Sequence, residues 1–190
     1  MSTRSADPVE VLHGTQVTLR KVTEADVEPL AKILAEPEVA RWWGRYDVDR
    51  VRRELLESPA MVVFVIDVHG VVAGSIQYFE EPASDYRHAG MDVFLSRDWH
   101  GQGLGSDSVR TLARHLVHDR GHHRLVIDPA ASNDAAIACY ERVGFRKVGR
   151  MRAYERGPDG TWHDCYMLEA LRDEIVWSRW ADRPGLIVRG

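Results

Sequence analysis

Hydrophobic residues along this chain follow two different periods, and these periods separate strands from helices. Apolar and β-branched runs bounded by turn residues predict strands at 17–20, 61–68, 71–78, 90–95, 124–128, 145–149 and 166–171. Apolar positions spaced three or four residues apart predict helices at 23–34, 48–56, 109–117 and 133–143. The interleaving of these elements predicts an α/β (α+β) domain.

Turn and cap residues mark the predicted ends of several elements. Thr23 is predicted as the N-cap of the first helix, and Pro37 as the residue that ends this helix. His69-Gly70 predicts a hairpin that joins two of the strands as antiparallel neighbours. Gly144 is predicted as the C-cap of the last helix.

The chain is predicted to form one domain. Its 190 residues are enough to bury a single core, and no repeat or long linker divides them. Residues 1–13 are predicted to be a flexible leader, 14–172 the domain, and 173–190 a C-terminal extension. Trp177 and Trp180 suggest that the extension docks as a further helix.

Composition and charge narrow the classes of function. The formal net charge of −4 argues against a nucleic-acid partner and leans towards a small cationic one. No apolar run is long enough to span a membrane and the polar start lacks the core of a signal peptide, so we expect a cytoplasmic protein without a membrane partner. Cys139 and Cys165 have no zinc-type spacing, so no metal is expected.

A glycine-rich turn with the sequence HGQGLG, residues 100–105, follows one predicted strand and precedes an amphipathic helix. Backbone amides at a helix start, together with the helix dipole, attract anions, so the turn predicts a phosphate site. The Walker pattern would need Gly-Lys-Ser/Thr, whereas Gly105 is followed by Ser106 and Asp107. The dinucleotide fingerprint would need its glycines near the start of a βαβ unit, whereas these lie mid-chain after a hairpin.

A second segment, SNDAAIACYERVGF at 132–145, follows the glycine-rich turn along the chain and helps to interpret it. Together, the two segments resemble the glycine loop and the Asn-x-x-Ala-x-x-x-Tyr-x-x-x-Gly-Phe segment of the GCN5-related N-acetyltransferase (GNAT) superfamily. Over about 17–171, the resemblance implies a central mixed, mostly antiparallel sheet flanked by helices, with a strand, glycine-rich loop and helix as the cofactor site. It implies acetyl-CoA as the cofactor and N-acetylation of a primary amine as the reaction.

The resemblance also implies roles for single residues. The backbone of Phe94 and Leu95 would pair with the pantetheine arm of acetyl-CoA, and 102–106 would hold its pyrophosphate. Tyr140 matches the position from which the family's tyrosine protonates the departing thiolate, a step that suits a phenol. His100 is a departure, because the family usually has Arg or Gln there. The implied cofactor-binding residues are Phe94, Leu95, His100, Gly101, Gln102, Gly103, Leu104, Gly105, Ser106 and Asn133.

Three short segments are most similar, within the family, to the aminoglycoside 6′-N-acetyltransferases. They are ARWWG at 40–44, GMDVFL at 90–95 and DPAASN at 128–133. This similarity implies an aminoglycoside acceptor and antibiotic resistance. The segments at 154–156 and 159–164 are more similar to ribosomal-protein and polyamine acetyltransferases, so a peptide N-terminus or a polyamine is the alternative acceptor.

Asp92 is the candidate general base, because it lies on the strand that leads into the glycine-rich turn. A carboxylate there can take the proton that an ammonium group must lose before it attacks. Trp42 and Trp43 either form an aromatic wall or floor beneath the substrate or pack in the core. His163 is an alternative base. The predicted substrate-binding residues are Trp42, Trp43, Glu80, Glu81 and Asp92.

A different class of function is a non-catalytic module that only holds CoA. Such a module would need neither the base Asp92 nor the acid Tyr140, so their presence favours an enzyme. The sequence does not distinguish a monomer from a homodimer.

Overall fold

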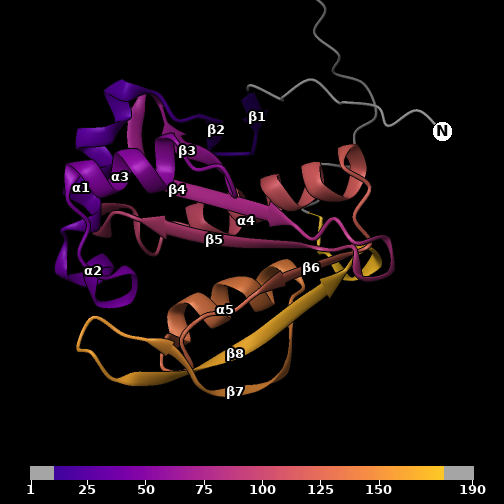
Figure 1. Cartoon of the computed structure of the whole chain (residues 1–190). Helices are drawn as coiled ribbons and strands as arrows, with labels where there is room; N and C mark the ends of the chain where they lie inside the picture. Colours follow the sequence, from indigo (N-terminus) through magenta and orange to yellow (C-terminus); the bar gives the residue numbers. More distant parts are fainter. Residues whose placement is uncertain (1–10, 178–190) are drawn as a thin grey trace, which may run out of the picture.

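Within residues 11–177, which the computed structural model describes, eight strands form one sheet in the order β1-β2-β3-β4-β5-β6-β8-β7 (Figure 1). Neighbouring strands are antiparallel except β5 and β6, which are parallel. This arrangement confirms the expected mixed, mostly antiparallel sheet. The strands are β1 (Val11–His13), β2 (Thr18–Lys21), β3 (Val62–Val68), β4 (Val71–Glu80), β5 (Ala89–Leu95), β6 (Arg124–Ile127), β7 (Arg146–Arg156) and β8 (Trp162–Leu171).

Helices cover both faces of this sheet. Two of them, α3 and α4, continue as single π-helical turns to Leu56 and Asp119. No helix in the described part of the chain is long and apolar enough to cross a membrane. The helices are α1 (Val27–Leu34), α2 (Pro37–Trp43), α3 (Val48–Val51), α4 (Leu104–Arg114) and α5 (Asp134–Val143).

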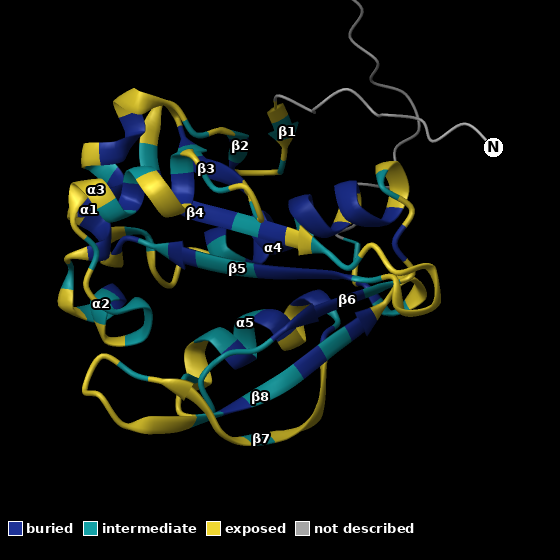
Figure 2. Ribbon diagram, viewed as in Figure 1, coloured by how far each residue is buried: buried dark blue, intermediate teal, exposed yellow. Residues whose placement is uncertain are grey.

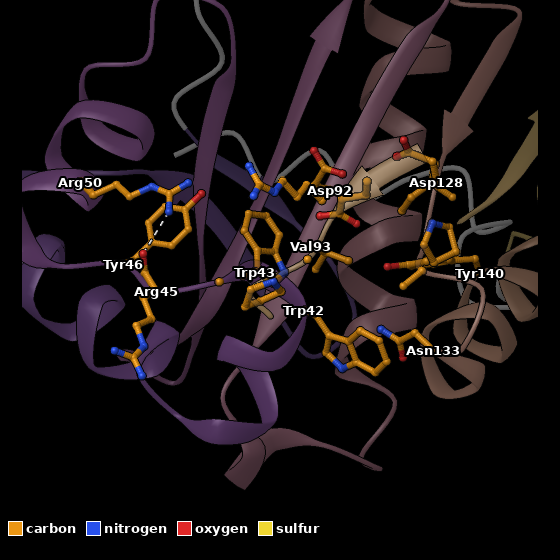
Figure 3. Close-up of a pocket in the computed structure, with 18 residues that line it drawn as sticks. Trp42, Trp43, Arg45, Tyr46, Arg50, Asp92, Val93, Asp128, Asn133 and Tyr140 are labelled. Carbon is orange, nitrogen blue, oxygen red and sulfur yellow. Dashed lines mark hydrogen bonds between the residues drawn. The ribbon is translucent and has the colours of Figure 1, made fainter. Parts of the chain in front are cut away.

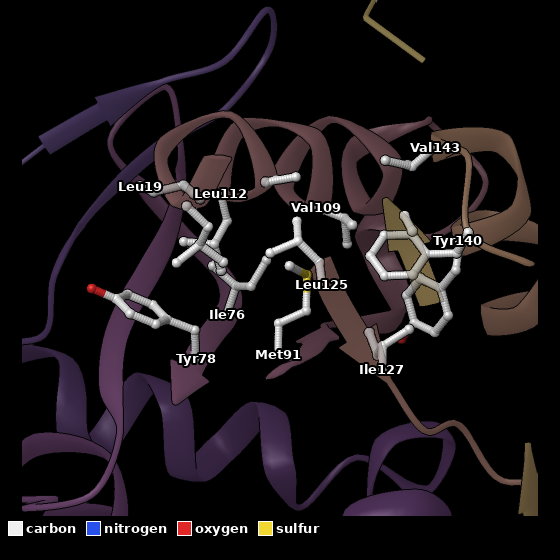
Figure 4. Close-up of a cluster of buried hydrophobic side chains, with 14 of the residues drawn as sticks. Leu19, Ile76, Tyr78, Met91, Val109, Leu112, Leu125, Ile127, Tyr140 and Val143 are labelled. Atoms are coloured by element: carbon white, nitrogen blue, oxygen red, sulfur yellow. The ribbon is translucent and has the colours of Figure 1, made fainter. Parts of the chain in front are cut away.

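The alternation of side chains along the strands produces a core on each face. In β3, Phe64 and Ile66 pack on one face, whereas Val63 and Val65 pack on the other. The first face is covered by α4 and α5 and forms the larger cluster (Figure 4). The second face is covered by α1, α2 and α3. Because both faces are buried, ligand-binding groups have to gather where the strands separate or end.

Strands β5 and β6 pair over two residues and then separate. Ala89 pairs with Leu125 and Gly90 with Val126, whereas β5 continues to Leu95 along β4 on its other side. Beyond Gly90, the edge of β5 that faces β6 therefore forms no further ladder pair with β6. The sheet opens at this point (Figure 1), which leaves backbone groups of β5 available to a ligand.

Pro37 begins a helix instead of ending one, which corrects the sequence prediction. The first helix, α1, already ends at Leu34, and Pro37 occupies the first turn of α2. A proline is well suited to this position because the first amides of a helix have no partner within it. The segment 40–44 therefore forms the end of α2 and its C-cap Gly44, whose φ is 77°.

Both ends of the described chain contact the rest of the domain. The last three residues of the predicted leader form β1, which pairs with β2. The carboxylate of Asp107 in α4 accepts a hydrogen bond from the Gln16 amide at 2.7 Å and thereby fixes the turn after β1. Trp177 packs against the larger core. Trp180 lies outside the described residues, so the predicted docking helix stays a prediction.

Candidate active site

The glycine-rich turn shapes the N-terminal end of α4. Gly101 and Gly103 have φ values of 73° and 82°, in the left-handed region that favours glycine. Gly103 directly precedes the helix, and the first amides of α4 have no partner within it. These amides and the positive end of the helix dipole together form an anion site.

Two side chains of this turn hold its own backbone. His100 Nε2 lies 2.9 Å from the carbonyl oxygen of Leu95, at the end of β5. Gln102 Nε2 donates a hydrogen bond to the carbonyl oxygen of Asp98 at 2.8 Å. Because both side chains are used in this way, the groups that the turn offers to an anion are its backbone amides.

A pocket of about 660 Å³ lies where β5 and β6 separate (Figure 3). Its walls come from the end of α2 and the connection to α3 (42–46), from Arg50 in α3, from β5, from the end of β6 and the segment after it (127–130), from α5 with its cap, and from the β7–β8 hairpin (155–158). Elements that are distant in sequence therefore meet at one cavity.

Asp92 lies on β5 in the wall of this pocket. Its cross-strand neighbour Gln77 donates a hydrogen bond from Nε2 to Asp92 Oδ2 at 3.3 Å. The pKa of Asp92 is raised to about 6, because burial disfavours the charged carboxylate and because the Asp128 carboxylate lies nearby. Burial also raises the pKa of Asp128. A carboxyl with a pKa near 6 is mostly ionised at neutral pH and is a stronger base than an ordinary aspartate.

A bulge in β7 brings Glu155 to this wall and places Tyr154 near Asp128. The register between β7 and β8 shifts before Glu155, and Ala153 has a φ of 49°. The carboxylate of Asp164 accepts a hydrogen bond from the Ala153 amide at 2.7 Å, which holds the bulge. The Asp128 carboxylate raises the pKa of Tyr154 to about 12 by its charge, and it also accepts a hydrogen bond from the Tyr154 hydroxyl. Glu155 itself lines the pocket.

Tyr140 reaches the same pocket from α5. Burial raises the pKa of Tyr140 well above its usual range, and the nearby Asp92 adds to this effect. The phenol therefore keeps its proton at neutral pH. The preceding residue, Cys139, has its Sγ 3.2 Å from Ser106 Oγ in the first turn of α4. The anion site at α4 and the pocket are therefore joined through α5.

The aromatic residues at the end of α2 form the opposite wall. Trp42, Trp43 and Tyr46 all line the pocket (Figure 3). The Trp43 ring packs edge-on against Phe94, with the ring centroids 4.9 Å apart, and against Tyr46 at 6.4 Å. Trp43 is thus fixed by the core and still presents a face to the cavity.

Several predicted residues lie elsewhere. Glu80 and Glu81 do not line the pocket. Glu80 ends β4, where its carboxylate accepts hydrogen bonds from Arg120 at 2.7 Å and pairs with His122 at 2.6 Å. His163 is exposed, with Nε2 2.9 Å from Asp159 Oδ1 in the β7–β8 hairpin, and also lies outside the lining. By contrast, the structure brings Asp92, Tyr140, Asn133, Trp42 and Trp43 together.

The prediction from sequence assigned no role to Gln77, Asp128, Tyr46 or Glu155. Asp128 belongs to one of the segments on which the family resemblance rests, and this membership could have identified it as a candidate site residue. Gln77 contacts Asp92 only because of the register between β4 and β5, and that register depends on the conformation of the connecting loop.

Comparison with known proteins identifies the family of this chain. A family model for the acetyltransferase (GNAT) domain matches residues 16–146, which is more than half of the chain. The chain belongs to the GNAT acetyltransferase family. Aminoglycoside N(6′)-acetyltransferase type 1 of Klebsiella pneumoniae is 30% identical over 162 residues, covering 76% of this chain and 79% of the relative.

Two solved structures show the same fold in detail. AAC(6′)-Ib in complex with paromomycin and acetyl-CoA has a TM-score of 0.70 and 27% identity, covering 84% of this chain and 95% of that one. RimL, a ribosomal L7/L12 alpha-N-protein acetyltransferase in complex with CoA, has a TM-score of 0.76 and 21% identity, covering 87% and 99%. This GNAT protein is accordingly an acetyl-CoA-dependent N-acetyltransferase.

Proposed function

We propose that this chain acetylates a primary amine by direct attack of the amine on acetyl-CoA, with Asp92 as the base and Tyr140 as the acid. The carrying observation is that one pocket holds a carboxyl whose pKa is about 6 and a buried phenol that retains its proton. A base and an acid with opposite protonation states are what this reaction needs at neutral pH.

The proposed reaction balances within these residues. Asp92 accepts a proton from the ammonium group, and the freed amine nitrogen forms a bond to the acetyl carbon. The nitrogen loses its second proton to solvent as the carbon–sulfur bond breaks, and the departing sulfur takes the proton of the Tyr140 hydroxyl. The products are an acetamide and CoA, after which solvent returns a proton to Tyr140 and removes one from Asp92.

The cofactor is proposed to lie across the opening between β5 and β6. The unpaired backbone of Phe94 and Leu95 would bind its pantetheine arm, and the amides of 102–106 its pyrophosphate. Asn133 caps α5 by accepting a hydrogen bond from the Ala136 amide at 3.2 Å, which leaves its side-chain nitrogen to contact the arm.

Replacing Gly103 by valine is expected to abolish CoA binding while the fold survives. A β-carbon at Gly103 meets no atom closer than 3.7 Å, but it occupies the space in front of the amides. The φ of 82° also makes a side chain there unfavourable, by about 1–2 kcal/mol. The matched control is Gly70→Val, because Gly70 has a φ of 84° and open surroundings in the β3–β4 turn. Calorimetric titration with CoA compares the variants, and full affinity in a folded Gly103→Val protein would refute the assignment.

The first candidate acceptor is the 6′-amine of an aminoglycoside, which would make the protein an antibiotic-resistance enzyme. Support comes from the Klebsiella relative and from AAC(6′)-Ib, whose names state that chemistry. The second candidate is the amine of a peptide N-terminus. It is favoured by the arginines in the pocket wall, since a polycation would meet like charges there.

A panel of amines is the test of this proposal. Purified protein and acetyl-CoA are incubated with aminoglycosides, polyamines and N-terminal peptides, and thiol release is followed together with the mass of the product. We expect one acceptor class to gain a single acetyl group at a rate far above that of acetyl-CoA alone. Tight CoA binding without thiol release for any amine would support the non-catalytic module instead.

A further inference from the structure

Side chains of opposite charge line the acceptor pocket in equal number. Three carboxylates and three guanidinium groups face it, namely those of Asp92, Asp128, Glu155, Arg45, Arg50 and Arg156. Arg45 and Arg50 come from the side of α2 and α3, and Asp128 comes from the opposite side, after β6 (Figure 3). The pocket is therefore lined by both charges and is not uniformly acidic.

The three carboxylates carry charge that the protein does not neutralise. Within residues 11–177, none of them forms an ion pair with a basic side chain. Asp92 accepts a hydrogen bond from the uncharged Gln77, and Glu155 Oε2 lies 3.8 Å from Cys165 Sγ. Asp92 and Asp128 are half-buried, whereas Glu155 is exposed. Half-buried carboxylates without a cationic partner favour a ligand that brings a positive charge.

Two of the guanidinium groups are equally uncompensated. Neither Arg45 nor Arg156 forms an ion pair in the described part of the chain, and Arg156 uses only Nε, which donates to the carbonyl oxygen of Gly160 at 3.2 Å. Both residues are exposed and line the pocket. Strand β7, which carries Arg156, is exposed along most of its length (Figure 2). Arg50 differs, because it pairs with Glu54 at 2.8 Å and stacks on the Tyr46 ring.

We infer that the acceptor carries an anionic group as well as its primary amine, with the amine at Asp92 and Asp128 and the anion at Arg45 and Arg156. This inference rests on the proposed function and specifies its substrate class. A ligand with both charges neutralises both sets of side chains at once, and a guanidinium group binds a carboxylate through two parallel hydrogen bonds. A polycation satisfies the carboxylates only and places further positive charge beside the arginines.

Two sources of this chemistry exist. One is a free amino acid whose amine and carboxylate are several bonds apart. The other is a peptide N-terminus that is followed by acidic side chains. Both present an ammonium group and a carboxylate to the pocket, and the acceptors used in the test distinguish them.

The test compares acceptors that differ only in the anion. One series contains ω-amino carboxylates of increasing length and their primary amides, and the other contains peptides with Glu or with Gln in the second and third positions. We expect the acidic acceptor of at least one matched pair to have a kcat/KM higher by about tenfold or more, as for one charge-assisted contact. The peptide or the amino-acid series then identifies the source.

Variants of Arg45 and Arg156 test whether these two arginines cause the preference for acidic acceptors. In Arg45→Gln/Arg156→Gln, the advantage of the acidic acceptor over its amide is expected to vanish through a higher KM for the acidic acceptor. The matched control is Arg152→Gln, because Arg152 is also exposed on β7 but does not line the pocket. Arg45→Glu is expected to shift the preference towards diamines.

Equal rates for acidic acceptors and their amides, or aminoglycosides as the best acceptors with rates that the arginine variants leave unchanged, would overturn the inference. The proposed function survives that outcome if acetylation of any amine still depends on Asp92. If no amine in either panel is acetylated, the proposed function and this inference both fail.

Discussion

Asp92→Asn is expected to lower the acetylation rate by orders of magnitude while acetyl-CoA still binds. The substitution keeps the shape of the side chain but removes its basicity and its charge. General base catalysis alone is worth about a hundredfold or more. Steady-state kinetics with the acceptor that the panel identifies measures the loss, and calorimetry with CoA shows that the cofactor site is intact.

The pH profile makes this prediction specific to a base. Asp92 accepts a proton only when it is ionised, and its pKa is raised to about 6. The kcat/KM of the wild type should therefore rise as the pH increases through about 6, and this inflection should be absent from Asp92→Asn. At high pH the difference in rate should narrow, because more of the amine is already deprotonated, whereas weaker amine binding should persist. Equal profiles for the two proteins would make Asp92 an ordinary strand residue.

Asp128→Asn supplies an independent check on the same group. The Asp128 carboxylate contributes to the raised pKa of Asp92, so its removal should move the inflection to lower pH. Asp85→Asn is the matched control, because Asp85 is an exposed aspartate outside the pocket. An inflection that does not move in Asp128→Asn would show that the two carboxylates are not coupled.

Thermal stability shows whether Asp92→Asn is slow because it lacks the base or because it has lost its fold. The folded pKa of Asp92 lies above its reference value of 3.8, so the folded state binds this proton more tightly than the unfolded state does. Ionisation of Asp92 therefore lowers the stability as the pH rises from about 4 to about 6, and the cost remains above that range. Asparagine removes this cost, so the Tm of the variant at neutral pH should equal or exceed that of the wild type.

The sequence identified candidate site residues where their position depends only on neighbouring elements along the chain. The glycine-rich turn needs only a strand before it and a helix after it, and both were predicted from periodicity. The same holds for Tyr140, because a motif on one helix carries it, and for Asp92, which alternation places on a strand next to the turn. Local sequence patterns therefore identified candidate residues whose position depends on a single strand or helix.

The sequence was less informative where the site depends on distant contacts. Glu80 was expected in a substrate loop, but β4 extends to it, and its partners Arg120 and His122 lie 40 and 42 residues away. The role of Asp128 beside Asp92 requires the parallel pairing of β5 with β6. Arg156 lies in a segment that the sequence indicates to be a hairpin, but its place in the pocket wall depends on how the β7–β8 hairpin packs against the rest of the chain. Such contacts follow from strand order and register, which the hydrophobic pattern does not specify.

Tyr140→Phe is expected to slow the chemical step by about a hundredfold or more, as for the loss of a general acid, with little change in acetyl-CoA affinity. Phenylalanine keeps the ring that packs in the larger core next to Phe145, with ring centroids 6.3 Å apart, and removes only the hydroxyl. Burial holds the pKa of Tyr140 far above neutral pH, so the wild-type phenol always carries the proton that the thiolate needs.

A single-turnover experiment tests this role without interference from product release. Enzyme in excess over acetyl-CoA is mixed with the acceptor, and the appearance of the free thiol is followed in time. Tyr78→Phe is the matched control, because Tyr78 is also a buried tyrosine of the larger core but lies outside the pocket. If only Tyr140→Phe is slow, and a thiol ester with a more acidic leaving thiol restores its rate, the hydroxyl donates the proton. A single-turnover rate equal to that of the wild type would assign Tyr140 to core packing alone, because a group that moves a proton in the rate-limiting bond cleavage must change that rate when it is removed.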